Sequence, residues 1–196
     1  MKYTYLFTLM ILLVYSCKSK ETIEIKQVDC KEMVTILPNL KNNLVKDSVS
    51  ISIPSEFIIS INSPVNYINW FYVINGKILR DGSFDYQVYN KKNITKVIHQ
   101  LNFDESYTNG QINIIFKERN HLISKKDAMR LLKKYNIEKS LDHLKFGDTI
   151  KLTNYDKFRS QNKYFINELN KINDSIRFRS MKKDGSFFYL DKKINW

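Results

Sequence analysis

Alternating apolar and polar positions dominate the first half of the chain and predict β-strands. Val49, Ile51 and Ile53 alternate with serines, as on a half-buried strand. The run 57–61 is apolar apart from Ser60, which is typical of a buried strand, and 67–74 is apolar on both faces, which is typical of a central strand. Further strands are expected at 84–88, 112–116, 149–152, 176–181 and 187–190.

Short dipeptides that tolerate positive φ mark the turns between these strands. Asn75-Gly76 follows 67–74, and Asp184-Gly185 lies between the last two strands, so each predicts a tight hairpin. Asp81-Gly82 offers a second turn after the first of these, which leaves the register of that hairpin open. The strands are therefore expected to pair antiparallel.

A period of 3.6 residues predicts helices in the second half. Ser124 and Asp127 form a capping box before an amphipathic stretch that ends near Tyr135, and Asn136 suits a left-handed C-terminal cap. A longer helix is expected from Asn154 to Asn173. A short helix is also expected after Asn93, with an apolar stripe formed by Ile94, Val97, Ile98 and Leu101.

The elements together predict an α+β fold, with mostly antiparallel β-sheet in the first half and two amphipathic helices and a terminal β-hairpin in the second half. The composition suits a packed core, because 43% of the 196 residues are hydrophobic and the chain has 12 Tyr and 12 Phe. We expect one domain over 31–196, or alternatively two lobes at about 45–119 and 120–196. Residues 17–30 are expected mainly as a tether, although Ile23, Ile25 and Val28 allow part of it to join a sheet edge.

The N-terminus contains an uncharged segment that is too short to span a membrane. Lys2 precedes a 13-residue uncharged run, Tyr3 to Tyr15, and Ser16 lies directly before Cys17. A membrane-spanning helix needs about 20 apolar residues, so this run is typical of an export signal. It resembles the type II signal peptide of bacterial lipoproteins, which is cut before the cysteine.

This resemblance implies that residues 1–16 are removed and that Cys17 carries a lipid anchor, with palmitate among its acyl chains. Lys18 stands where Asp is associated with retention in the inner membrane, so the resemblance implies a lipid-anchored protein of the outer membrane. Whether it faces the periplasm or the surface is left open. An ordinary signal peptide, or an uncleaved anchor, is the alternative.

The chain has a formal net charge of +12, which favours an anionic partner. An exported protein meets lipid phosphates, anionic glycans and acidic proteins, so no nucleic-acid partner is expected. A codon bias towards Lys, Asn and Ile explains the charge equally well. The helix predicted before Tyr135 has a candidate anion-binding face, for which a solvated helix surface is the alternative. The cations of this face are Lys125, Lys126, Arg130, Lys133 and Lys134.

Two other segments suggest binding. The stretch 123–135 resembles the opening of PepSY-type modules, which are small α+β domains of exported proteins, some of them linked to peptidase inhibition. The aromatic segment Tyr67–Tyr72 offers a platform for stacking glycans, although we expect it mainly to pack in the core.

Few residues suggest catalysis or metal binding. The histidines, His99, His121 and His143, lack the spacing of metal ligands, and the five glycines form no phosphate-binding loop. If Cys17 is lipidated, Cys30 remains as a single thiol that we expect to be buried and passive. No catalytic residue, cofactor or metal site is therefore predicted.

Three hydroxyl side chains follow Asp and precede an aliphatic residue, namely Ser48, Thr149 and Ser175. This pattern resembles the acceptor sites for O-glycosylation in some Gram-negative envelopes.

The sequence therefore predicts a non-enzymatic, outer-membrane-anchored lipoprotein that binds an envelope protein or an anionic glycan. The alternatives are an immunity or peptidase-inhibitor-like protein, and an enzyme that acts on envelope glycans or peptides. The enzyme would need a cleft lined by paired carboxylates, or by a histidine together with Cys30.

Overall fold

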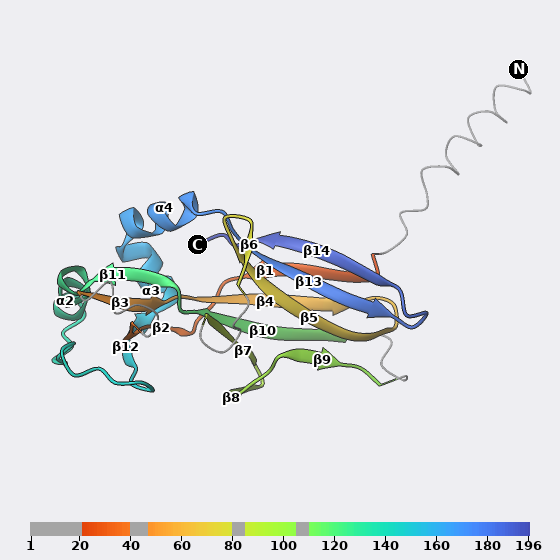
Figure 1. The fold of residues 1–196 in the computed structure, drawn as a ribbon, viewed down its shortest axis with the longest axis horizontal. Helices are drawn as coiled ribbons and strands as arrows, with labels where there is room; N and C mark the ends of the chain where they lie inside the picture. Colours follow the sequence, from red (N-terminus) through yellow and green to blue (C-terminus); the bar gives the residue numbers. More distant parts are fainter. Residues whose placement is uncertain (1–20, 40–46, 80–84, 105–109) are drawn as a thin grey trace, which may run out of the picture.

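The computed structural model describes residues 21–39, 47–79, 85–104 and 110–196. It is mostly antiparallel β-sheet with three helices, which confirms the predicted α+β class (Figure 1). Within these ranges, no helix has the length and the apolar character needed to cross a membrane.

Two five-stranded sheets pack face to face as a β-sandwich. The first sheet, in spatial order, contains β1 (Ile23–Val28), β4 (Pro54–Ile61), β10 (Gly110–Glu118), β7 (Tyr86–Asn90) and β8 (Asn93–Val97). The second contains β14 (Phe187–Lys193), β13 (Asp174–Lys182), β5 (Val65–Ile74) and β6 (Lys77–Ile78), with β9 (Gln100–Asn102) also paired to β5. We call this second sheet the outer sheet.

Aromatic side chains fill the space between the two sheets. Phe57 and Phe116 of the first sheet meet Phe178 of the outer sheet with ring centroids 5.9 and 6.1 Å apart. Trp70 lies 5.8 Å from Phe116. The rings meet edge to face, which is the favourable arrangement for aromatic pairs, so this cluster joins the two sheets.

A smaller sheet and the helices form one end of the molecule (Figure 1). Its strands in spatial order are β11 (His121–Ser124), β3 (Ser48–Ser52), β2 (Met33–Pro38) and β12 (Ile150–Asn154). Only Ile53 separates β3 from β4, and only Arg119 and Asn120 separate β10 from β11, so these strand pairs run on from the sandwich. The helices are α2 (Lys125–Lys134), α3 (Tyr155–Gln161) and α4 (Lys163–Lys171).

Local chemistry places the predicted turns and caps. Asn75 and Gly76 have φ values of 47° and 79° and close the β5–β6 hairpin, as predicted. Ser124 accepts a hydrogen bond at 3.0 Å from the backbone N–H of Asp127, which confirms Ser124 as the N-cap of α2, and its hydroxyl donates to the Asp127 carboxylate at 2.6 Å. Asn136 has φ 54° and confirms the left-handed cap after α2.

The short helix predicted after Asn93 is wrong, because this segment forms β8 followed by β9. Ile94, which was expected on the buried stripe, is 44% exposed. The Asn93 side chain accepts from the hydroxyl of Thr95 at 2.7 Å, and β-branched residues at 94, 95 and 97 suit a strand. The apolar spacing fitted a helix, but pairing with β7 and β5 decides the structure.

The long helix predicted from Asn154 to Asn173 is divided at Asn162, which has φ −126° and ψ 47°. The Asn162 side chain donates to the Phe158 carbonyl at 2.7 Å and to the Tyr135 hydroxyl at 2.7 Å. Asparagine competes well for backbone groups, so it ends α3 and allows α4 to begin in a new direction.

The prediction of a tether is wrong for Ile23–Val28, which forms the edge strand β1 against β4. Ile23 and Ile25 are buried, so the alternative role at a sheet edge is the one observed. Residues Met33–Pro38 form β2. Pairing of β5 with β13 also crosses the boundary that separates the alternative two lobes.

Candidate functional site

Strand β5 divides the aromatic segment Tyr67–Tyr72 between two faces. Trp70 and Tyr72 are buried in the sandwich core, as expected. Tyr67 and Phe71 are half-buried and occupy the alternate positions of the strand, which face away from the core. Core packing therefore explains only half of this segment.

Arg179 of β13 lies among aromatic rings on the outward face of the outer sheet. Its guanidinium carbon is 5.9 Å from the ring centroid of Tyr67 and 5.5 Å from those of Phe71 and Phe187. Its Nε donates to the Asn69 side chain at 3.1 Å. These contacts fix the orientation of the guanidinium by cation–π attraction and one hydrogen bond.

Two exposed rings extend this surface onto β14, since Phe187 is 49% exposed and Tyr189 is 57% exposed. Tyr189 is directly opposite Arg179 in the strand register. We call this surface the arginine–aromatic face. It consists of Tyr67, Asn69, Phe71, Arg179, Phe187 and Tyr189.

The charge of Arg179 has no acidic partner in the described ranges. The neighbouring Arg177, in contrast, forms a two-pronged ion pair with Asp191 at 2.8 and 2.9 Å. Within the ranges that the structure describes, no carboxylate forms an ion pair with Arg179. The face therefore combines flat apolar rings with a positive, well-oriented hydrogen-bond donor.

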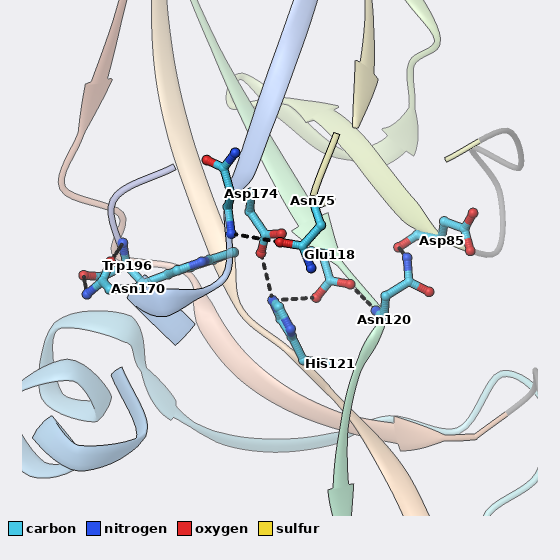
Figure 2. A network of polar contacts seen from close by, with 9 residues as sticks. Asn75, Asp85, Glu118, Asn120, His121, Asn170, Asp174 and Trp196 are labelled. Carbon is cyan, nitrogen blue, oxygen red and sulfur yellow. Dashed lines mark hydrogen bonds and ion pairs between the residues drawn. The ribbon is translucent and has the colours of Figure 1, made fainter. Parts of the chain in front are cut away.

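A second feature lies where the sandwich meets the helical end (Figure 2). Nε2 of His121 on β11 is 3.4 Å from an oxygen of Glu118 on β10 and 3.5 Å from an oxygen of Asp174 on β13. The second Glu118 oxygen accepts from the backbone N–H of Asn120. Both carboxyl groups are buried. We call Glu118, His121 and Asp174 the histidine cluster.

Burial shifts the protonation of this cluster. It lowers the pKa of His121 to about 4, because a buried imidazolium loses its hydration. Burial raises the pKa of Asp174 to about 6, against a smaller lowering by the nearby Trp196 indole. At neutral pH the imidazole is therefore neutral and Asp174 is ionised. The carboxylate oxygens at 3.4 and 3.5 Å from Nε2 favour the tautomer that carries the imidazole proton on that nitrogen.

The His121 ring also forms part of the wall of a pocket of about 650 Å³ between β11, α4 and the end of β5. Nε2 is fully buried, so it faces the carboxylates and not the pocket. The indole of Trp196 packs edge-on against the His121 ring at 5.4 Å. Asn170 holds the Trp196 backbone through two hydrogen bonds of 3.0 and 3.2 Å.

The structure places the five predicted cations on α2, but several of them have local partners. Lys125 is 3.4 Å from Asp142, and Arg130 pairs with Asp127 at 2.9 Å. Lys134 donates to the carbonyl of Gln161 and to Asn162. No such partner is seen for Lys126 and Lys133 in the described chain. This helix is therefore a weaker anion site than its charge suggests.

Cys30 is buried, as predicted, and burial raises its pKa to about 11. It therefore stays a thiol at neutral pH and is a poor nucleophile. Its electrostatic neighbours are Glu32, Glu56 and Lys91, so the structure does not place it with a histidine. Among the described residues, no group of three or more His, Cys, Asp or Glu side chains is arranged to hold a metal ion.

The predicted glycosylation residues lie in different environments. Ser48 is buried at the start of β3 and accepts a hydrogen bond from Asn39 at 2.8 Å. Thr149 is exposed before β12, and Ser175 is half-buried within β13. Thr149 is therefore the most accessible of the three hydroxyls. Cys17 and the predicted signal peptide lie outside the described residues.

Comparisons with protein-family models, with curated proteins and with solved structures found no match.

The sequence analysis offered the Tyr67–Tyr72 part of the arginine–aromatic face as a glycan platform, but it did not predict the contribution of Arg179 and β14 or the histidine cluster. Glu118 precedes His121 by three residues, which was a local signal for half of the histidine cluster. Asp174 comes from a distant strand and gave no such signal. For the arginine–aromatic face, the available signal was the alternation of arginines and apolar residues in 176–181, which places Arg177 and Arg179 on the solvent side.

Proposed function

We propose that this chain is an exported, lipid-anchored protein of the outer membrane that binds an anionic glycan of the cell envelope through the arginine–aromatic face. In this proposal, sugar rings stack on the exposed rings and an acidic group of the glycan binds Arg179. The protein acts by binding and not by catalysis.

The N-terminal sequence supports the proposed location at the outer membrane. Lys2, the uncharged run and Cys17 together resemble a lipoprotein signal. Each buried methylene contributes about 0.8 kcal/mol to membrane binding, so two or more acyl chains on Cys17 give a stable anchor. Such an anchor keeps the folded body next to envelope glycans at high local concentration.

The position of Arg179 is the single observation on which the choice of ligand depends. A guanidinium held by three rings and Asn69 loses little conformational entropy when it binds a carboxylate or phosphate. Aromatic side chains at a surface supply flat apolar area suited to the apolar faces of sugars. A flat sheet face with both properties suits an extended acidic saccharide.

Titration calorimetry of the full-length protein with trigalacturonate and with neutral maltotriose tests this proposal. We expect the acidic trisaccharide to bind and Arg179→Gln to weaken its binding by about tenfold or more, since a hydrogen bond to a charged group contributes about 1.5–3 kcal/mol. Arg159→Gln, an exposed arginine on α3, is the matched control and should bind normally.

The aromatic half of the face has its own control. Tyr189→Ala should weaken binding, whereas Tyr164→Ala, which removes a 79% exposed ring on α4, should not. Equal binding of both trisaccharides, or no binding of either, would contradict the proposal. Specific recovery of a toxin or peptidase from solubilised envelopes would instead assign the immunity or inhibitor alternative.

The anchor is tested separately by mass spectrometry of the native protein. A mature chain that begins at an acylated Cys17 and partitions into detergent is expected. A chain that still begins at Met1, or that stays in the aqueous phase, would contradict the proposed lipid anchor and outer-membrane location.

A further inference from the structure

The pocket beside the histidine cluster is separate from the arginine–aromatic face and has no role in the proposed glycan binding. Its volume of about 650 Å³ lies within the usual range for small-molecule sites. About half of its wall is apolar. The apolar residues are Ile74, Leu122, Ile123, Phe165, Leu169 and Ile172. A ligand for this pocket therefore combines an apolar body with a polar group.

His121 gives the pocket a hydrogen-bond acceptor. Its buried Nε2 faces Glu118 and Asp174 and carries the imidazole proton, so the lone pair remains on Nδ1 (Figure 2). An imidazole backed by carboxylates is also a stronger acceptor than an isolated one. A ligand group next to His121 must therefore be a donor.

The charges around the pocket favour a donor that is also a cation. Asp174 is fully buried beside the Trp196 indole, and in the described ranges no Lys or Arg side chain forms an ion pair with it. At the pocket, Glu168 and Lys171 pair with each other at 2.6 Å and largely cancel. The buried carboxylate of Asp174 therefore adds a negative charge behind His121, although the chain as a whole carries +12.

We propose that this pocket binds a small apolar primary amine, whose ammonium group donates to His121 and is attracted by the carboxylate of Asp174 behind it. The hydrocarbon part of the ligand packs against Phe165 and the aliphatic wall. Binding here needs neither the lipid anchor nor the arginine–aromatic face.

Three probes that share one phenyl ring test the proposal on the full-length protein in a non-ionic detergent. They are 2-phenylethylammonium, 2-phenylethanol and 3-phenylpropanoate, titrated at pH 7 by calorimetry. We expect the ammonium compound to bind about tenfold or more tightly than the alcohol, which corresponds to about 1.4 kcal/mol. Equal affinities, tighter binding of the carboxylate, or no binding of any probe would each overturn the proposal.

A variant and its control identify the charge responsible. Asp174→Asn should bring the affinity for the ammonium probe down to that for the alcohol, while leaving the alcohol unchanged. Asp104→Asn, an exposed position after β9, should have no effect. An unchanged preference in folded Asp174→Asn would show that this carboxylate is not involved.

The pH dependence of the unmodified protein keeps the test independent of folding of the variant. The ammonium probe stays charged between pH 7 and pH 5, whereas Asp174 takes up a proton near pH 6. The preference for the amine should therefore fall across this range, and a constant preference would oppose the proposal. The charged or titratable groups around His121 are Tyr72 on β5, Glu118 on β10, Asp174 on β13, and Glu168 and Lys171 on α4.

Discussion

Replacing Asp174 by Asn should stabilise the protein at neutral pH, although it removes a buried group that contacts a histidine. The pKa of Asp174 is raised from 3.8 to about 6, so the folded state binds more protons than the unfolded state between these values. The free energy of unfolding therefore falls as the pH rises through this range. One pKa unit corresponds to about 1.36 kcal/mol, so the penalty at pH 7 is about 3 kcal/mol. Asparagine has a similar shape and no charge.

The same change should have no effect near pH 4, where the carboxyl group is largely protonated in the folded state. The contribution of His121 to the pH dependence of stability has the opposite sign. Its pKa is lowered to about 4 in the folded state, so the unfolded state takes up the proton at a higher pH than the folded state. The two slopes nearly cancel between pH 4 and pH 6 in the unmodified protein. In Asp174→Asn only the histidine slope remains, so stability should rise with pH by about 3 kcal/mol between pH 4 and pH 6.5.

Urea unfolding of the full-length protein at pH 4 and pH 7 measures both effects, with Asp104→Asn as the exposed control. The expected stabilisation requires that the desolvation of the Asp174 carboxylate outweighs its ion pairing with His121. If His121 were instead protonated and paired with Asp174, removing the carboxylate would cost about 3–5 kcal/mol at pH 7. A destabilised Asp174→Asn protein at pH 7 would therefore refute it.

Three further outcomes follow from packing and burial. Cys30 should resist alkylation by iodoacetamide at pH 8 in the folded protein and react rapidly in urea, because its thiol is buried with a pKa of about 11; rapid labelling of the native protein would contradict this. Phe116→Ala should lower the free energy of unfolding by about 3–5 kcal/mol, and a loss below 1 kcal/mol would show that the sheets do not depend on this ring. Asn162→Ala should cost about 1–2 kcal/mol by removing its bonds to Phe158 and Tyr135, as measured by urea unfolding, and an unchanged midpoint would contradict the role given to this break between helices.

The sequence predicts elements best where local chemistry decides them. The turn at Asn75-Gly76 and the caps at Ser124 and Asn136 depend on residues within three positions of one another. The segment after Asn93 has an apolar spacing that fits a helix, but its strand pairs with β7, which lies outside any local window. The break at Asn162 likewise depends on Tyr135, the C-cap residue of α2.

The candidate sites were harder to predict, because each one is assembled by strand pairing. The strand at 67–74 is apolar on both faces, and its sequence does not say which face the other sheet covers. The answer comes from packing against Phe116, which buries Trp70 and leaves Phe71 outside. The histidine cluster unites three strands, and only the spacing of Glu118 and His121 is visible locally.

Both candidate sites depend on the pairing of β5 with β13, at different places along it. Asp174 is opposite Ile74 at one end, whereas Arg179 is opposite Asn69 further along the same register. At about 3.4 Å per residue, Asp174 and Arg179 are roughly 17 Å apart. This distance is about twice the screening length of roughly 8 Å at physiological salt, and Arg179 faces solvent, so Arg179→Gln should change the pH profile set by the buried Asp174 only slightly. A variant that alters both binding activities together would therefore indicate loss of this strand pairing, and not a contact with either ligand.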